Sequence, residues 1–129
     1  MGTLGYGVST KSIDVTVTAT SGTYNLVVKD VDDDTDLKWT GSAGTKGTTI
    51  EAVAGLAAGM TGWSVQDENG DWQAMTAYEE DGVTLKSGGA TGEETTVTFG
   101  AAYNSSRSEG PLEAGTYTDQ VVFIATAAN

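Results

Sequence analysis

The stretch Gly115-Thr116-Tyr117-Thr118-Asp119-Gln120-Val121-Val122-Phe123-Ile124-Ala125-Thr126 decides the fold of this chain. It follows a turn marked by Gly110-Pro111 and runs as an unbroken series of β-formers almost to the last residue. From Val121 to Ala125 it is apolar on both faces, which is typical of a strand covered on both sides. We therefore expect this strand to lie inside a sheet, beneath other layers, and to tie the end of the chain into the core.

Other strand signals repeat along the chain. Residues 13–20 and 24–29 alternate apolar and polar side chains, and they predict a hairpin or two neighbouring strands of one sheet. Asn69-Gly70, the dipeptide that best tolerates the positive φ angles of a type I′ turn, lies between residues 62–66 and 71–75. That pattern predicts a second hairpin. Residues 37–40, 83–86 and 95–103 read as further short strands.

Helical patterns are weak. The best candidate, residues 50–60, is rich in alanine but is interrupted by Gly55 and Gly59, so it predicts one or two turns at most. Short strands at near-regular spacing indicate an all-β chain, an antiparallel β-sandwich of the immunoglobulin-like or pilin-like kind. We expect an N-terminal extended arm at residues 1–12 and a single sandwich domain at 13–129. The predicted core is Val15, Val17, Leu26, Val28, Trp63, Val65, Val97, Phe99, Tyr117, Val121 and Phe123.

The composition excludes several classes of function. The chain of 129 residues has no histidine and no cysteine, which removes the usual general base, the commonest metal ligand and any thiol nucleophile. A formal net charge of −12 disfavours nucleic acid and anionic lipid as partners. No apolar run reaches membrane-spanning length, and the first residues lack the features of a signal peptide. We expect an exported protein whose leader is absent from this sequence.

Several short motifs support a family resemblance. They are Tyr24-Asn25-Leu26-Val27-Val28, the segment from Ile50 to Leu56, Trp63-Ser64-Val65, the segment from Thr96 to Ala101 and the segment from Ala114 to Val121. Together they resemble secreted β-sandwich domains of bacterial surfaces, and the closing strand is similar to those that end pilin-like, fimbrial major subunits. The resemblance implies an extracellular structural role in a filament, and it brings no catalytic residues with it.

The N-terminus carries the first functional candidate. Leu4, Tyr6 and Val8 recur at a period of two, with glycine at both intervening positions. Such a segment fits a donor strand that inserts into a groove of the next subunit. We expect the closing strand to form one wall of that groove, through Val121, Val122, Phe123 and Ile124. The alternatives are an unstructured leader or an edge strand of the chain's own sandwich.

An acidic run provides a candidate metal site. Asp30, Asp32, Asp34 and Asp36 alternate on a predicted loop, and carboxylates so placed are ligands for Ca²⁺. The run is not an EF-hand, because Thr35 and Gly41 stand where glycine and glutamate are required. A solvated acidic turn is the alternative.

Aromatic residues provide a candidate carbohydrate site, since Trp39, Trp72 and Tyr78 offer flat rings to a sugar. The adjacent carboxylates Glu79-Glu80 and Glu93-Glu94 lack an evident shared cleft, so we expect no enzyme. The sequence thus predicts a self-assembling structural subunit of a surface filament. The alternative is a monomeric adhesin or carbohydrate-binding module stabilised by Ca²⁺.

Overall fold

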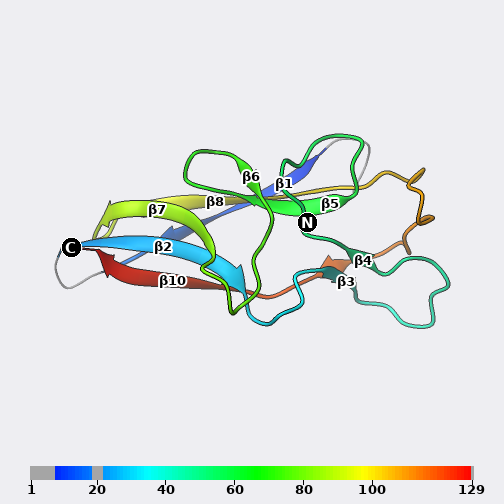
Figure 1. The fold of residues 1–129 in the computed structure, drawn as a ribbon, viewed down its shortest axis with the longest axis horizontal. Helices are drawn as coiled ribbons and strands as arrows, with labels where there is room; N and C mark the ends of the chain where they lie inside the picture. Colours follow the sequence, from blue (N-terminus) through cyan, green and yellow to red (C-terminus); the bar gives the residue numbers. More distant parts are fainter. Residues whose placement is uncertain (1–7, 19–21, 129) are drawn as a thin grey trace.

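The chain folds as an all-β sandwich, seen in a computed structural model that describes residues 8–18 and 22–128 (Figure 1). No described residue is helical, and so no helix there is long and apolar enough to cross a membrane. All pairings between named strands are antiparallel. The strands are β1 (Ser9–Thr16), β2 (Thr23–Asp30), β3 (Leu37–Trp39), β4 (Thr49–Ile50), β5 (Gly62–Gln66), β6 (Trp72–Gln73), β7 (Val83–Ala90), β8 (Glu94–Ala102), β9 (Tyr117–Thr118) and β10 (Val121–Ala128).

The strands form three sheets. The order β1-β8-β5-β6 makes the first layer of the sandwich, and the order β10-β2-β7 makes the second. A small sheet, β4-β3-β9, lies at the end of the sandwich opposite the C-terminus (Figure 1). The outermost strands are β1 and β6 in the first layer and β10 and β7 in the second, and β1 and β10 each have one described partner.

The core follows from alternation on the inner strands. Tyr24, Leu26 and Val28 of β2 are almost fully buried, and Trp63 and Val65 of β5 face them from the other layer. The predicted core residues Leu26, Val28, Trp63, Val65 and Val97 are buried, and the other six pack against the core while partly exposed. The core also contains residues that the sequence did not indicate: Tyr24, Leu37, Ile50, Met75, Val83, Leu85, Ala101 and Leu112.

The predicted pairing of the first two strands is wrong. β1 pairs with β8 in one layer, whereas β2 lies in the other layer between β10 and β7. Alternation fixes which face of a strand is apolar, but it does not choose the partner strand. β1 and β2 are therefore consecutive in the chain but belong to different layers.

The second predicted hairpin is confirmed, but its turn is different. β5 and β6 pair antiparallel, with Val65 opposite Gln73. Gly70 has φ of 81°, whereas Asn69 has no positive φ, so this is not a type I′ turn. The Asp67 carboxylate instead accepts hydrogen bonds from the amides of Asn69, at 2.9 Å, and Asp71, at 3.0 Å. An Asp side chain of this kind organises a longer loop.

The stretch from Gly115 to Thr126 is divided between two strands, and the second of them is not covered on both sides. Asp119 and Gln120 separate β9 in the small sheet from β10 in the second layer. β10 is an outermost strand, and no residue in it is fully buried. The prediction of a covered strand was therefore wrong. Apolar side chains on both faces are a property of the strand's composition, and they do not determine how many strands lie beside it.

Candidate functional site

An apolar groove opens on the side of the sandwich where the edge strands β1 and β10 lie. It has a volume of about 290 Å³. Buried Trp63 and Leu37 form part of its lining, and β1 and β10 each contribute to it. The complete lining is Lys11, Ile13, Leu37, Trp63, Phe99, Tyr117, Thr118, Asp119 and Val121.

The core is less well covered on this side than elsewhere. Neither β1 nor β10 contains a fully buried residue, whereas β2, β5, β7 and β8 each contain at least two. Ile13 of β1 is 39% exposed although it lines the groove. Phe99 and Val121 pack against the core but remain half-buried. The sandwich therefore has incompletely covered apolar side chains along this groove.

The predicted donor residues lie at the start of the chain. Leu4 and Tyr6 fall outside the described residues, and Val8 is half-buried immediately before β1. Residues 9–12 belong to β1 and pair with Thr98 to Ala101 of β8, so the expected boundary between residues 12 and 13 falls inside this strand.

The predicted acceptor residues all lie on β10, and one of them, Val121, is in the groove lining. Val121 lines the groove, and Val121 and Phe123 pack against the core. Val122 and Ile124 are half-buried. Across the ladder, Phe123 pairs with Val28 and Ile124 with Val27 of β2.

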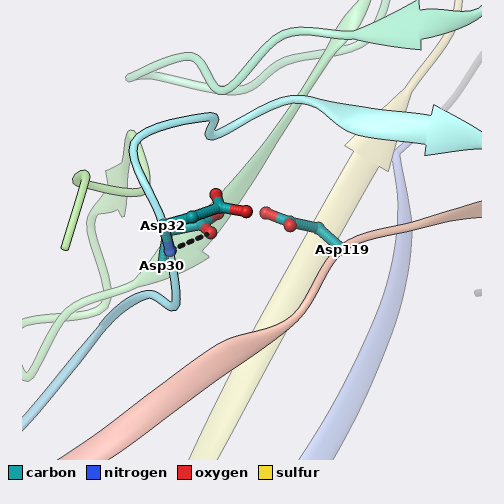
Figure 2. Close-up of side chains that lie close together, drawn as sticks. All are labelled: Asp30, Asp32 and Asp119. Carbon is teal, nitrogen blue, oxygen red and sulfur yellow. Dashed lines mark hydrogen bonds between the residues drawn. The ribbon is translucent and has the colours of Figure 1, made fainter.

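A cluster of carboxylates lies beside the groove (Figure 2). Asp30 ends β2, Asp32 follows it in the loop, and Asp119 comes from the link between β9 and β10. One carboxylate oxygen from each lies within 4.8 Å of the others. Backbone hydrogen bonds hold these two segments together, because the amide of Val31 donates to the carbonyl of Gln120 at 3.2 Å. Asp119 also lines the groove, so the two features adjoin.

Asp30 has an unusual environment for a carboxylate. Its side chain is fully buried, and only its Oδ1 accepts a hydrogen bond, from the amide of Asp32 at 3.2 Å. Burial and the neighbouring Asp119 carboxyl raise the pKa of Asp30 to about 8. Both effects favour the neutral, protonated form of Asp30 in the folded protein, and a bound cation would oppose them.

The chain matches no protein-family model, and it has no significant match among curated proteins or among solved structures.

The structure brings together only part of the predicted metal set. Asp30 and Asp32 belong to the cluster, whereas Asp34 forms an ion pair with Lys38 at 2.5 Å. The Oδ1 of Asp34 also accepts the amide of Asp36, as the Oδ1 of Asp32 accepts the amide of Asp34. Carboxylates at alternate positions thus serve as successive turn-forming acceptors along this loop. No sequence pattern pointed to Asp119, which lies far along the chain in a segment predicted to be continuous strand.

The predicted sugar-binding rings contact different parts of the fold. Trp39 of β3 donates its indole Nε1 hydrogen to the carbonyl of Ala114 at 3.0 Å. Trp72 of β6 lies over Gly100, and Tyr78 is 50% exposed, with the Lys29 ammonium 4.4 Å from its ring centre. Each of the three rings therefore contacts a different residue of the chain.

Two of the paired glutamates have hydrogen-bonding roles in turns. Glu80 accepts the amide of Ala77 through Oε1 at 3.0 Å, and Glu93 accepts the amide of Ala90 through Oε2 at 2.9 Å. The hydrogen bond from the Ala90 amide and the nearby Lys86 ammonium lower the pKa of Glu93. Both contacts stabilise local turns in the chain.

Proposed function

We propose that this protein is a non-enzymatic, extracellular structural subunit of a surface filament, assembled by β-strand complementation. The groove between β1 and β10 is the observation that carries the proposal. An inserted strand would lie between these outermost strands and pair with them, as in other cases where an extended segment adds to a sheet edge.

The proposed occupant is residues 1–8 of a second copy of the chain. This segment contains no acidic residue, whereas the whole chain has a net charge of −12, so the arm adds no carboxylate that would repel another copy. Fully extended, it would span about 26 Å at the usual rise of about 3.3 Å per residue. A segment of that length could extend past the start of its own β1 toward another copy of the chain.

The groove volume matches side chains better than a large ligand. Its 290 Å³ lies just under the range of about 300–1,000 Å³ that is usual for small-molecule pockets. An apolar cavity of about 150 Å³ accommodates benzene. The groove therefore suits one or two side chains such as those of Leu4 and Tyr6. Each large apolar side chain that is fully buried contributes about 1.5–3 kcal/mol to association.

Head-to-tail insertion would produce a filament. The donor arm and the acceptor groove are different surfaces of the same chain, and a contact between unlike surfaces that does not close into a ring continues indefinitely. The acidic surface would keep neighbouring filaments apart. If the arm instead pairs within its own chain, the protein should be monomeric. The oligomeric state in solution therefore distinguishes insertion into another copy from pairing within one chain.

The test is negative-stain electron microscopy of the full chain beside a variant lacking residues 1–8. We expect filaments from the full chain and monomers from the shortened one. A synthetic peptide of residues 1–8 should bind the shortened chain and should block assembly of the full chain. The combined change Leu4→Ser, Tyr6→Ser and Val8→Ser keeps the arm's length and should abolish assembly.

Monodisperse particles from both chains would overturn the filament proposal. The binding-module alternative would then be favoured, and in that case Trp72→Ala should abolish binding to a glycan array while removal of the arm has no effect.

A further inference from the structure

Three carboxylates converge at the junction between β2 and β10. Asp30 and Asp32 come from one segment and Asp119 from another, and Figure 2 shows the side chain of Asp119 pointing toward the other two. Their nearest oxygens lie within 4.8 Å of one another. Like charges at such distances repel, so the arrangement requires either a retained proton or a cation.

The buried atoms of the cluster have no partner in the protein. The Oδ2 atoms of Asp30 and Asp119 are both inaccessible to solvent and accept no hydrogen bond. Asp30 is 0% exposed, so water does not reach its side chain from outside. In the described parts of the chain, the ion pairs are Lys38 with Asp34 and Lys86 with Glu93, and neither lies in the cluster.

We propose that Asp30, Asp32 and Asp119 bind one divalent cation, and that Ca²⁺ is the preferred ion. Ca²⁺ takes oxygen ligands at about 2.3–2.6 Å, so two oxygens on one ion lie at most about 5 Å apart. The spacing of the cluster meets this limit. Asp32 is exposed, which provides an entry path and room for water molecules to complete the coordination.

The ligand chemistry separates Ca²⁺ from other metals. The site offers only carboxylates, and the chain has no histidine or cysteine, the ligands that zinc and copper favour. Mg²⁺ demands near-ideal octahedral geometry and loses water reluctantly. A partly buried site with three carboxylates on two segments therefore favours the larger and more adaptable ion.

Bound Ca²⁺ would join two parts of the fold that are distant in sequence. It would connect the end of β2 to the link that precedes β10, and Asp119 on that link also lines the apolar groove. The ion would thereby fix one end of the groove wall. This inference does not rest on the proposed function, since the three carboxylates belong to one chain.

The experiment is calorimetric titration of the metal-free protein with CaCl₂, together with thermal unfolding in Ca²⁺, in Mg²⁺ and in EDTA. We expect one Ca²⁺ per chain and a midpoint of unfolding several degrees higher in Ca²⁺ than in EDTA, with a smaller shift in Mg²⁺. Asp119→Asn and Asp32→Asn should each weaken Ca²⁺ binding by roughly tenfold or more, because the number of charged ligands sets the affinity.

Asp33→Asn is the matched control, because Asp33 is exposed, lies in the same loop and carries the same charge. It should change the affinity less than about twofold, as expected for a charge screened by solvent. In EDTA, Asp119→Asn should unfold no earlier than the unchanged protein, because it removes a carboxylate that repels its acidic neighbours. The proposal is overturned if Ca²⁺ produces neither binding heat nor stabilisation, or if Asp33→Asn weakens binding as much as Asp119→Asn.

Discussion

Asp30 links the stability of the fold to pH. Its carboxyl titrates at 3.8 ordinarily and at about 8 in the folded protein, chiefly because burial disfavours the charge. Between these values the folded protein binds more protons than the unfolded chain, so the free energy of unfolding falls as pH rises. The fall is at most about 1.4 kcal/mol per pH unit and ends above the folded pKa. The Asp119 and Asp32 carboxyls also raise the pKa of Asp30, whereas the hydrogen bond from the amide of Asp32 lowers it.

We therefore expect the metal-free protein to lose stability steadily between mildly acidic and mildly alkaline pH. Urea unfolding in EDTA across this range measures it. Asp30→Asn should flatten the dependence, whereas Asp33→Asn should leave it in place. An equally steep dependence in Asp30→Asn would assign the effect to the general negative charge of the protein.

Gly100 is required by close packing in the middle of β8. A Cβ there would lie 2.6 Å from Cη2 of Trp72 and 2.9 Å from Cδ2 of Leu56. Gly100→Ala should therefore reduce the free energy of unfolding by about 1–3 kcal/mol, as overpacking does elsewhere. Urea titration measures the loss. The loss should shrink when Trp72→Leu is also present, and an unchanged loss would place the strain elsewhere.

At this scale, the sequence predicted residues whose burial follows from local alternation. Leu26, Val28 and Val65 are fully buried as expected. Residues whose burial depends on other segments were missed, including Met75 and Leu112, which lie outside alternating runs. Asp119 was missed for the same reason, since only folding brings it to Asp30.

Asp67 controls the turn between β5 and β6. Besides two backbone amides, its carboxylate accepts the Nε2 hydrogen of Gln73 at 2.9 Å. We expect Asp67→Ala to lower the urea midpoint clearly, because three hydrogen bonds are lost. Asn69→Ala should change stability by no more than about 0.5 kcal/mol, since Asn69 is exposed and needs no positive φ. The reverse order of effects would indicate a type I′ turn in solution.

Elements were predicted more reliably than their partners. The alternating runs located β2 and β8, because a period of two is a local property, and the Asn69-Gly70 dipeptide located β5. The pairing of β1 with β8 could not be predicted in this way, because it joins segments far apart in the chain, such as Ser12 and Thr98, which are 86 residues apart. The break between β9 and β10 at Asp119 and Gln120 was also missed. It depends on contacts with residues just after β2, such as the hydrogen bond from Val31 to Gln120.

Coverage of the core is uneven across the whole molecule. The inner strands bury their apolar side chains, while the groove between β1 and β10 leaves Ile13 and Val121 partly exposed. A sandwich that was complete in itself would cover this side with a further strand or a loop. The fold class was thus predictable from the sequence, whereas the groove was not, because it results from which strands are outermost.

If the proposed assembly uses this groove, a charge added on one face of β1 should have a different effect from a charge added on the other. Ile13 lines the groove, whereas Ser12 hydrogen-bonds with Thr98 at 2.9 Å on an exposed part of the sheet. Ile13→Glu should leave the monomer folded, with a stability change of about 1 kcal/mol or less because the side chain is already 39% exposed. It should nevertheless abolish filaments, since an inserted strand would bury the new charge without a partner.

Ser12→Glu adds the same charge on the other face and should still assemble. Light scattering and electron microscopy of both variants, with circular dichroism to verify folding, provide the comparison. Filaments from a folded Ile13→Glu protein would show that assembly does not use this groove.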